Sequence, residues 1–146
     1  DARFLANQVV LVGYGRVGRE IAQALRAASL PFVVADANRE RVDDLRQAGQ
    51  AAVFGDAAEP ETLVQAHIAH ARLLVIATPD TLAARRMIET ARALNPAIAV
   101  VARSHNPDEA RRLAEGAGQG VTALAPQTEL ARSMAGAVLQ ALRDTS

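Results

Sequence analysis

Short apolar runs recur along the chain at regular intervals. Each covers only a few residues, is rich in β-branched side chains and lacks the alternation of a half-exposed strand. Such runs are typical of parallel strands that are buried on both faces. We therefore expect six strands, the last of them the weakest: Val9 to Val12, Phe32 to Ala35, Ala52 to Phe54, Leu73 to Ala77, Ile98 to Ala102, and Val121 to Leu124.

Helical patterns fill the segments between these runs. The first predicted helix carries one apolar face, made of Val17, Ile21, Ala24, Leu25 and Ala28. Local signals bound the other helices: Gly49 ends the second, Pro60 opens the third, Asp80 caps the fourth, Asn95-Pro96 ends it, Asn106 caps the fifth, and Pro126 opens a last helix that runs to about Leu142. Because strands and helices alternate, we expect a parallel sheet with helices on both faces, joined by right-handed crossovers.

The loop after the first run carries the glycine pattern of a dinucleotide-binding fold, Gly13-Tyr14-Gly15-Arg16-Val17-Gly18. A strand precedes this loop, a helix begins within it, and Asp36 ends the next strand. This context predicts an α/β fold of the Rossmann type: a doubly wound, six-stranded parallel sheet in the order 3-2-1-4-5-6, with helices on both faces and a C-terminal helix. The glycines allow a tight turn, a close approach of phosphate to the backbone and a close approach of the helix to the sheet. Free N–H groups at the helix start are expected to face the phosphates.

Asp36 lies where the ribose of an adenosine is expected. Its carboxylate can accept hydrogen bonds from both ribose hydroxyls and repels a 2′-phosphate, so we expect NAD(H) or a plain adenine nucleotide rather than NADP(H). Arg39 weakens this exclusion because it is able to bind a 2′-phosphate. Helix capping is the alternative role of Asp36, although Asn38 is the better cap.

The other candidate binding residues follow the ends of further strands. Arg16 and Arg103 offer guanidinium groups to phosphate. The alternative for Arg16 is a solvated surface side chain, and the alternative for Arg103 is a surface salt bridge. Asp56 can accept a hydrogen bond from the adenine amino group or shape a turn, Thr78 offers a hydroxyl, and Asp80 is better suited to capping. We predict that these residues line the cofactor site together with the glycine loop and Asp36: Ala37, Gly55, Asp56, Ala57, Ala77, Thr78, Pro79 and Arg103.

Composition restricts the classes of function. The 146 residues include 16 acidic and 16 basic ones, and zero net charge argues against nucleic-acid binding. The chain has no cysteine, which excludes thiol nucleophiles and disulfides, and every basic residue is arginine. No apolar run approaches the roughly 18 residues of a membrane span. Since the chain begins at Asp1, we expect it to be a piece of a larger protein.

Neither a metal site nor a catalytic group is predicted. His67, His70 and His105 show no convincing pattern of metal ligands, and no Ser-His-Asp set or carboxylate pair stands out. An NAD-dependent dehydrogenase would need substrate and acid–base groups from a second domain, for which no sequence is present. A scaffold with a vestigial site is a further alternative, against which the intact Gly15 and Asp36 argue.

Taken together, the loops resemble one family, the TrkA-N domain, also called RCK-N for regulator of potassium conductance. The resemblance is greatest to the cytoplasmic NAD-binding domain of Kef-type potassium/proton antiporters, and it covers about residues 8 to 142. The shared segments occur in the same order: the glycine loop, Asp36, Gly55-Asp56-Ala57, Ala77-Thr78-Pro79-Asp80, Ala93-Leu94-Asn95-Pro96 and Val101-Ala102-Arg103.

The resemblance implies a regulatory domain that binds NAD(H) or AMP, ADP or ATP without turning it over, and that gates an attached potassium transporter. Residues 1–146 would then be a single Rossmann nucleotide-binding domain, excised from a larger membrane transporter and located at the cytoplasmic face of the inner membrane. The glycine loop with Arg16 would hold phosphate, Asp36 the ribose, and Asp56-Ala57 the adenine. Glutathione, a ligand of Kef systems proper, stays open as a ligand of this chain.

The last helix, within residues 127–143, is apolar on more than one side. Leu130, Met134, Val138 and Leu142 form one stripe, and Ala131, Ala135 and Leu139 make a second side apolar. Because packing against one core needs a single stripe, the second side suggests a partner helix and a homodimer, a pairing that the family resemblance also implies. The alternative is a helix that lies in a groove of its own domain.

Overall fold

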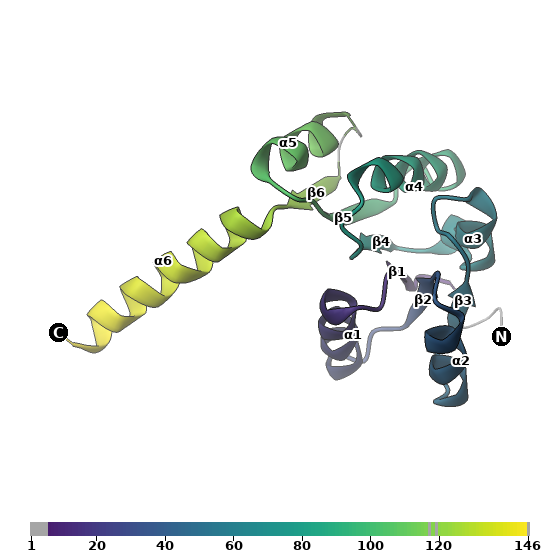
Figure 1. The fold of residues 1–146 in the computed structure, drawn as a ribbon, viewed down its shortest axis with the longest axis horizontal. Coiled ribbons are helices and arrows are strands. Elements are labelled where there is room, and N and C mark those ends of the chain that lie inside the picture. The colour runs from purple at the N-terminus through teal and green to yellow at the C-terminus, as the bar shows by residue number, and fades with distance from the viewer. Residues whose placement is uncertain (1–5, 117, 119, 146) are drawn as a thin grey trace.

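The computed structural model describes residues 6–116, 118 and 120–145. Its sheet has the predicted order, β3-β2-β1-β4-β5-β6, and every neighbouring pair of strands is parallel (Figure 1). The strands are β1 (Val9–Val12), β2 (Phe32–Asp36), β3 (Ala52–Phe54), β4 (Leu73–Ile76), β5 (Ala99–Arg103) and β6 (Val121–Leu124). They agree with the predicted runs to within one residue at each end.

Helices cover both faces of the sheet, as predicted. Helices α1 and α2 lie on one face, and α3, α4 and α5 lie on the other (Figure 1). The helices are α1 (Arg16–Ala27), α2 (Arg39–Gln47), α3 (Pro60–Gln65), α4 (Thr81–Leu94), α5 (Pro107–Gly116) and α6 (Pro126–Asp144). The short 3-10 helix η2 (Ile68–His70) was not predicted, because three residues carry no periodicity.

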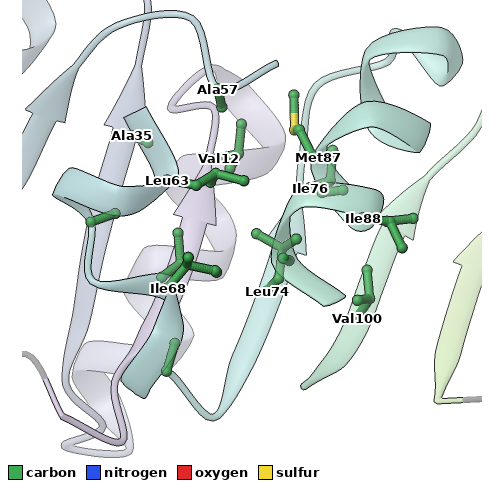
Figure 2. Close-up of a cluster of buried hydrophobic side chains, with 14 of the residues drawn as sticks. Val12, Ala35, Ala57, Leu63, Ile68, Leu74, Ile76, Met87, Ile88 and Val100 are labelled. Atoms are coloured by element: carbon green, nitrogen blue, oxygen red, sulfur yellow. The ribbon is translucent and has the colours of Figure 1, made fainter. Parts of the chain in front are cut away.

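Two hydrophobic layers hold these helices to the sheet. Along β1, Val10 and Val12 belong to the layer under α3 and α4, while Val9 and Leu11 belong to the layer under α1 and α2. Figure 2 shows the first layer, in which Leu63 of α3 lies close to Val12. Both faces of the central strands are therefore buried, which explains their continuous apolar sequence.

The apolar face predicted for α1 is partly wrong. The buried residues of α1 are Gly18 and Ala22, whereas Val17 is 38% exposed. Ile21 and Leu25 are half-buried, and Ala24 and Ala28 are exposed. Small residues let the backbone of α1 approach the sheet closely, so the contact is centred on them and not on the larger side chains beside them.

Helix α6 projects away from the sheet, and none of its described residues is buried (Figure 1). This arrangement contradicts the alternative in which the last helix lies in a groove of its own domain. In the described part of the chain, no helix has both the length and the apolar character that spanning a bilayer requires.

Side-chain amides fasten the turn around η2 to the rest of the fold. The amide of Asn95 donates to the carbonyl oxygens of Ile68 (3.0 Å) and Ala71 (2.8 Å), and that of Gln8 donates to the carbonyl of Ala66 (3.0 Å). The asparagine that ends α4 therefore has a structural role that its stop signal alone did not indicate.

Candidate functional site

A pocket of about 400 Å³ opens at the carboxyl edge of the sheet. The register brings the ends of the strands to this edge, because Val12 at the end of β1 lies beside Ala35 of β2 and Ile76 of β4. The predicted residues that line the pocket are Gly13, Tyr14, Gly15, Arg16, Val17, Asp36, Ala37, Gly55, Asp56, Ala57, Ala77, Thr78, Pro79 and Arg103. The structure thus gathers these residues in one place, while their binding roles remain predictions.

Gly18 is the one predicted residue that does not line the pocket. A Cβ atom at this position would overlap the carbonyl oxygen of Gly13, so glycine is needed where α1 passes the loop. Gly13 has a φ of +95°, and a Cβ atom there would stand 2.8 Å from Cγ2 of Thr78. Two glycines therefore shape the loop through backbone conformation and close contact.

Gly15 differs from these two glycines. It is the N-cap of α1 with extended backbone (φ −78°), and a Cβ atom at Gly15 would meet nothing within 4 Å. The start of α1 has no side-chain cap and no acidic residue in its first turn. By contrast, Asn38 caps α2 and Asp80 caps α4. The start of α1 therefore has N–H groups without a side-chain cap beside the pocket, where an anion is favoured.

Asp36 is fixed at the centre of the edge by backbone N–H groups. Its Oδ2 accepts from the N–H of Tyr14 at 2.8 Å and its Oδ1 accepts from the N–H of Asn38 at 2.7 Å. Arg41 Nη1 lies 3.6 Å from Oδ2, and Asp36 is 7% exposed. Asn38, and not Asp36, caps the helix by accepting from the N–H of Arg41. Each carboxylate oxygen keeps a further lone pair for a ribose hydroxyl.

The remaining polar groups that line the pocket differ in whether they form hydrogen bonds within the described part of the chain. Asp56 Oδ1 accepts from the N–H of Ala58 at 2.9 Å, the turn geometry that was its alternative role. Asp80 Oδ1 accepts from the N–H of Ala83, which makes Asp80 a cap that also lines the pocket. Thr78 Oγ1 is buried and has no hydrogen-bond partner among the described residues. A ligand with hydrogen-bonding groups would satisfy that hydroxyl.

The arginines are placed differently from one another. Arg16 lines the pocket, is exposed and has no partner among the described residues. Arg103 Nη1 donates to the carbonyl of Ala77 at 3.2 Å. Arg39 does not line the pocket, because its guanidinium lies over the Phe54 ring at 4.1 Å from the centroid. The cation beside Asp36 is Arg41, and binding of a 2′-phosphate by Arg39 stays a prediction.

Sequence reasoning missed several lining residues, namely Val12, Ala35, Arg41, Ala83 and Met87. The two strand residues could have been added because they directly precede the predicted loops. Arg41, Ala83 and Met87 come from helices whose rotation about their axes the sequence leaves open. In the described part of the chain, no group of three His, Asp or Glu residues is placed to hold a metal ion.

Comparison with known proteins identifies the family and the fold of the chain. The chain is 40% identical over 131 residues to YbaL of Escherichia coli (strain K12), covering 89% of this chain and 23% of YbaL. It is 33% identical over 138 residues to K(+) efflux antiporter 2, chloroplastic, of Arabidopsis thaliana, covering 92% of this chain and 11% of that protein. The chain thus spans less than a quarter of the length of either relative.

Solved structures show the same fold. The crystal structure of the TrkA-N domain of inner membrane protein YbaL from Escherichia coli has a TM-score of 0.83 and 38% identity, covering 90% of this chain and 96% of that one. The Shewanella denitrificans Kef CTD in its AMP-bound form has a TM-score of 0.70 and 25% identity, covering 92% and 81%. The TrkA-N domain model matches residues 9–123. The chain therefore belongs to the TrkA-N domain family.

Proposed function

We propose that the pocket binds an adenine nucleotide, NAD(H) or AMP, ADP or ATP, and that the chain is a regulatory domain of a potassium transporter. The observation that carries this proposal is that the start of α1, at Gly15, has no side-chain cap and lines the pocket. Phosphate would lie there with Arg16, and the ribose would lie on Asp36. Adenine would lie toward Asp56 and Ala57, which follow the carboxyl end of β3.

Related structures support this choice of ligand. The Kef CTD of Shewanella denitrificans was solved with AMP, and the GsuK channel, similar in fold alone at 19% identity and a TM-score of 0.69, was solved with NAD. Both ligands share the adenosine monophosphate portion that the glycine loop and Asp36 would hold. We expect binding without turnover, because several relatives are named as potassium-efflux systems, antiporters or channels.

Calorimetry with NADH, NADPH, AMP and ATP tests the proposal. We expect NADH or an adenine nucleotide to bind, and NADPH to bind more weakly than NADH because the Asp36 carboxylate repels a 2′-phosphate. The variant Gly15→Val should weaken this binding, because it adds a side chain at a residue that lines the pocket and where a Cβ atom would meet nothing within 4 Å. Absence of heat from every nucleotide at millimolar concentration would overturn the proposal.

The exposed surface of α6 supports a homodimer as part of the same proposal. Its large apolar side chains are more than half exposed: Leu130, Met134, Val138, Leu139 and Leu142. A groove of about 370 Å³, lined mainly by apolar residues of α1, β4, β5 and the start of α6, lies open beside it. We propose that α6 of a second copy covers this groove, because both surfaces are apolar and no described part of the chain covers either.

The groove and the nucleotide pocket share a wall formed by Val17, Ala77 and Arg103. A nucleotide that contacts this wall would bind one arrangement of the dimer better than another, and that difference would bias the attached transporter. The transporter would be a transmembrane part of the same polypeptide, with this chain at the cytoplasmic face of the inner membrane. The rest of the gene provides the check: upstream membrane spans are expected, and their absence would contradict the attachment.

Sedimentation of the chain tests the dimer. We expect a concentration-dependent dimer that Met134→Arg weakens, because the arginine would place a charge in an apolar contact. Val64→Arg is the matched control, since Val64 of α3 is also more than half exposed and does not line the groove. A wild-type chain that stays monomeric at every concentration would contradict this role of α6 and leave nucleotide binding untouched.

A further inference from the structure

A second groove, of about 540 Å³, lies between α1 and α2. It shares only Tyr14 and Arg41 with the nucleotide pocket, so most of its wall is separate from the proposed nucleotide site. Leu45, Ala48 and Gly49 supply its apolar part. The groove is large enough for a small organic ligand, and none of the proposed nucleotide contacts requires it.

Positive charge is concentrated in this groove. Arg19, Arg26 and Arg41 line it, and Asp44 is the one acidic residue in its lining. Neither Arg19 nor Arg26 forms an ion pair with a carboxylate among the described residues. Because the whole chain has zero net charge, the excess is local to this groove.

Aromatic groups hold two of these arginines in place. Arg26 Nη2 donates to the Tyr14 hydroxyl at 3.3 Å, and its Cζ lies 5.3 Å from the centroid of the Phe32 ring. Arg19 Cζ lies 5.8 Å from the centroid of the Tyr14 ring. Aromatic contacts position guanidinium groups but leave their charge unneutralised, so both remain available to an anion.

We propose that this groove is a second binding site, for a small soluble phosphate compound that carries two or more negative charges. Guanidinium groups bind phosphate oxygens through paired N–H donors. Arg19 and Arg26, which form no ion pair with a carboxylate among the described residues, favour a ligand with two or more negative charges. The Tyr14 hydroxyl accepts from Arg26, which leaves its own hydrogen to donate to the same ligand. The amide of Gln23 adds a further donor to the wall.

Tyr14 connects this groove to the nucleotide pocket. Its side chain lines the groove, while its backbone N–H donates to Asp36, the proposed ribose-binding residue. An anion that moves the Tyr14 ring would also move this N–H group, so the two sites influence each other's affinity. By linkage, the nucleotide would change the affinity for the anion by the same factor. This coupling rests on the proposed function, whereas binding in the groove does not.

Titration with inorganic pyrophosphate, at ionic strength held constant with sodium chloride, tests the groove. We expect saturable binding that the double variant Arg19→Gln/Arg26→Gln weakens at least about tenfold. The double variant Arg111→Gln/Arg132→Gln makes the same change in net charge, at exposed arginines paired with Asp108 and Glu129, and should bind like the wild type. Gly15→Val should also keep this binding, because its side chain enters the other pocket.

Three results would overturn the proposal. They are unchanged binding in Arg19→Gln/Arg26→Gln, an equal loss in the charge-matched control, and a loss confined to Gly15→Val, which would place pyrophosphate in the glycine loop. Binding to phosphatidic acid vesicles without binding to pyrophosphate would overturn the assignment to a soluble ligand.

Saturating pyrophosphate should change the affinity for NADH in the wild type by about threefold or more. An unchanged NADH affinity would refute the coupling. Absence of binding by NADH, AMP and ATP alike would refute the proposed function and leave the groove result standing.

Discussion

Replacing Asp36 with alanine removes the carboxylate on which the ribose assignment depends, and it also disturbs the fold. The carboxylate accepts from two backbone N–H groups at 2.7 and 2.8 Å, and the residue is 7% exposed. Each N–H that loses its partner costs about 1–3 kcal/mol, so we expect Asp36→Ala to lower the free energy of unfolding by about 2–5 kcal/mol. Urea denaturation measures this change.

A loss of nucleotide affinity in Asp36→Ala therefore has two causes that this variant does not separate: the loss of the ribose contact and the displacement of the glycine loop. The ligand can be changed in place of the protein, by comparing AMP with 2′-deoxy-AMP on the wild type. A hydrogen bond to a charged group contributes about 1.5–3 kcal/mol, so calorimetry should show binding of the deoxy ligand weakened by about tenfold or more. In Asp36→Ala the two ligands should bind alike, which completes a double-mutant cycle. Equal affinities of AMP and 2′-deoxy-AMP for the wild type would refute the ribose assignment.

Three further predictions concern stability, and urea denaturation measures each of them. Gly18→Ala should lower the free energy of unfolding by about 3 kcal/mol, because its methyl group would overlap the backbone of Gly13. Gly116→Ala, with open space around it, should be neutral or stabilising. Equal effects of the two variants would contradict the close approach of α1 to the loop. Asn95→Ala should cost about 2–4 kcal/mol, because two carbonyls lose their donor; no change would contradict the role assigned to that amide. Leu63→Ala should cost about 2–5 kcal/mol, since Leu63 is fully buried, while Val64→Ala next to it, 55% exposed, should cost well under half as much; a reversed order would contradict the rotation of α3.

Much of the fold could be predicted because its central strands are buried on both faces. Val9 to Val12 has no polar residue, and that continuity identifies a parallel strand without any knowledge of its neighbours. The strand order followed from the glycine loop, whose position after the first strand is tied to one topology. Local capping chemistry fixed other boundaries, as at Asp80 and Asn106, where the side chains accept the expected backbone N–H groups.

Side-chain direction was harder to predict. Sequence periodicity grouped Val17 and Ala24 with the buried face of α1, although the helix approaches the sheet through Gly18 and Ala22. The same limit applies to α2, where Arg39 and Arg41 are both near Asp36 in sequence. The ring of Phe54, over which the Arg39 guanidinium lies, belongs to β3 and is distant in sequence.

Contacts between segments that are distant in sequence also explain those features of the candidate site that the sequence motifs did not predict. The pairing of Tyr14 with Asp36 joins residues that are 22 positions apart, and nothing in either segment signals it. The arginine groove depends on α1 and α2 lying side by side on the same face. Its members, Arg19, Arg26 and Arg41, look like ordinary solvent-exposed residues when each helix is considered alone.

The central claim is that the uncapped N–H groups at the start of α1 hold the phosphate of an adenine nucleotide. A crystal structure of the chain grown with saturating AMP tests it most directly. We expect phosphate oxygens within hydrogen-bonding distance of the N–H groups that follow Gly15, and ribose hydroxyls that donate hydrogen bonds to the Asp36 carboxylate. A glycine loop that stays empty in such crystals, or that is filled by the chain's own side chains, would contradict it.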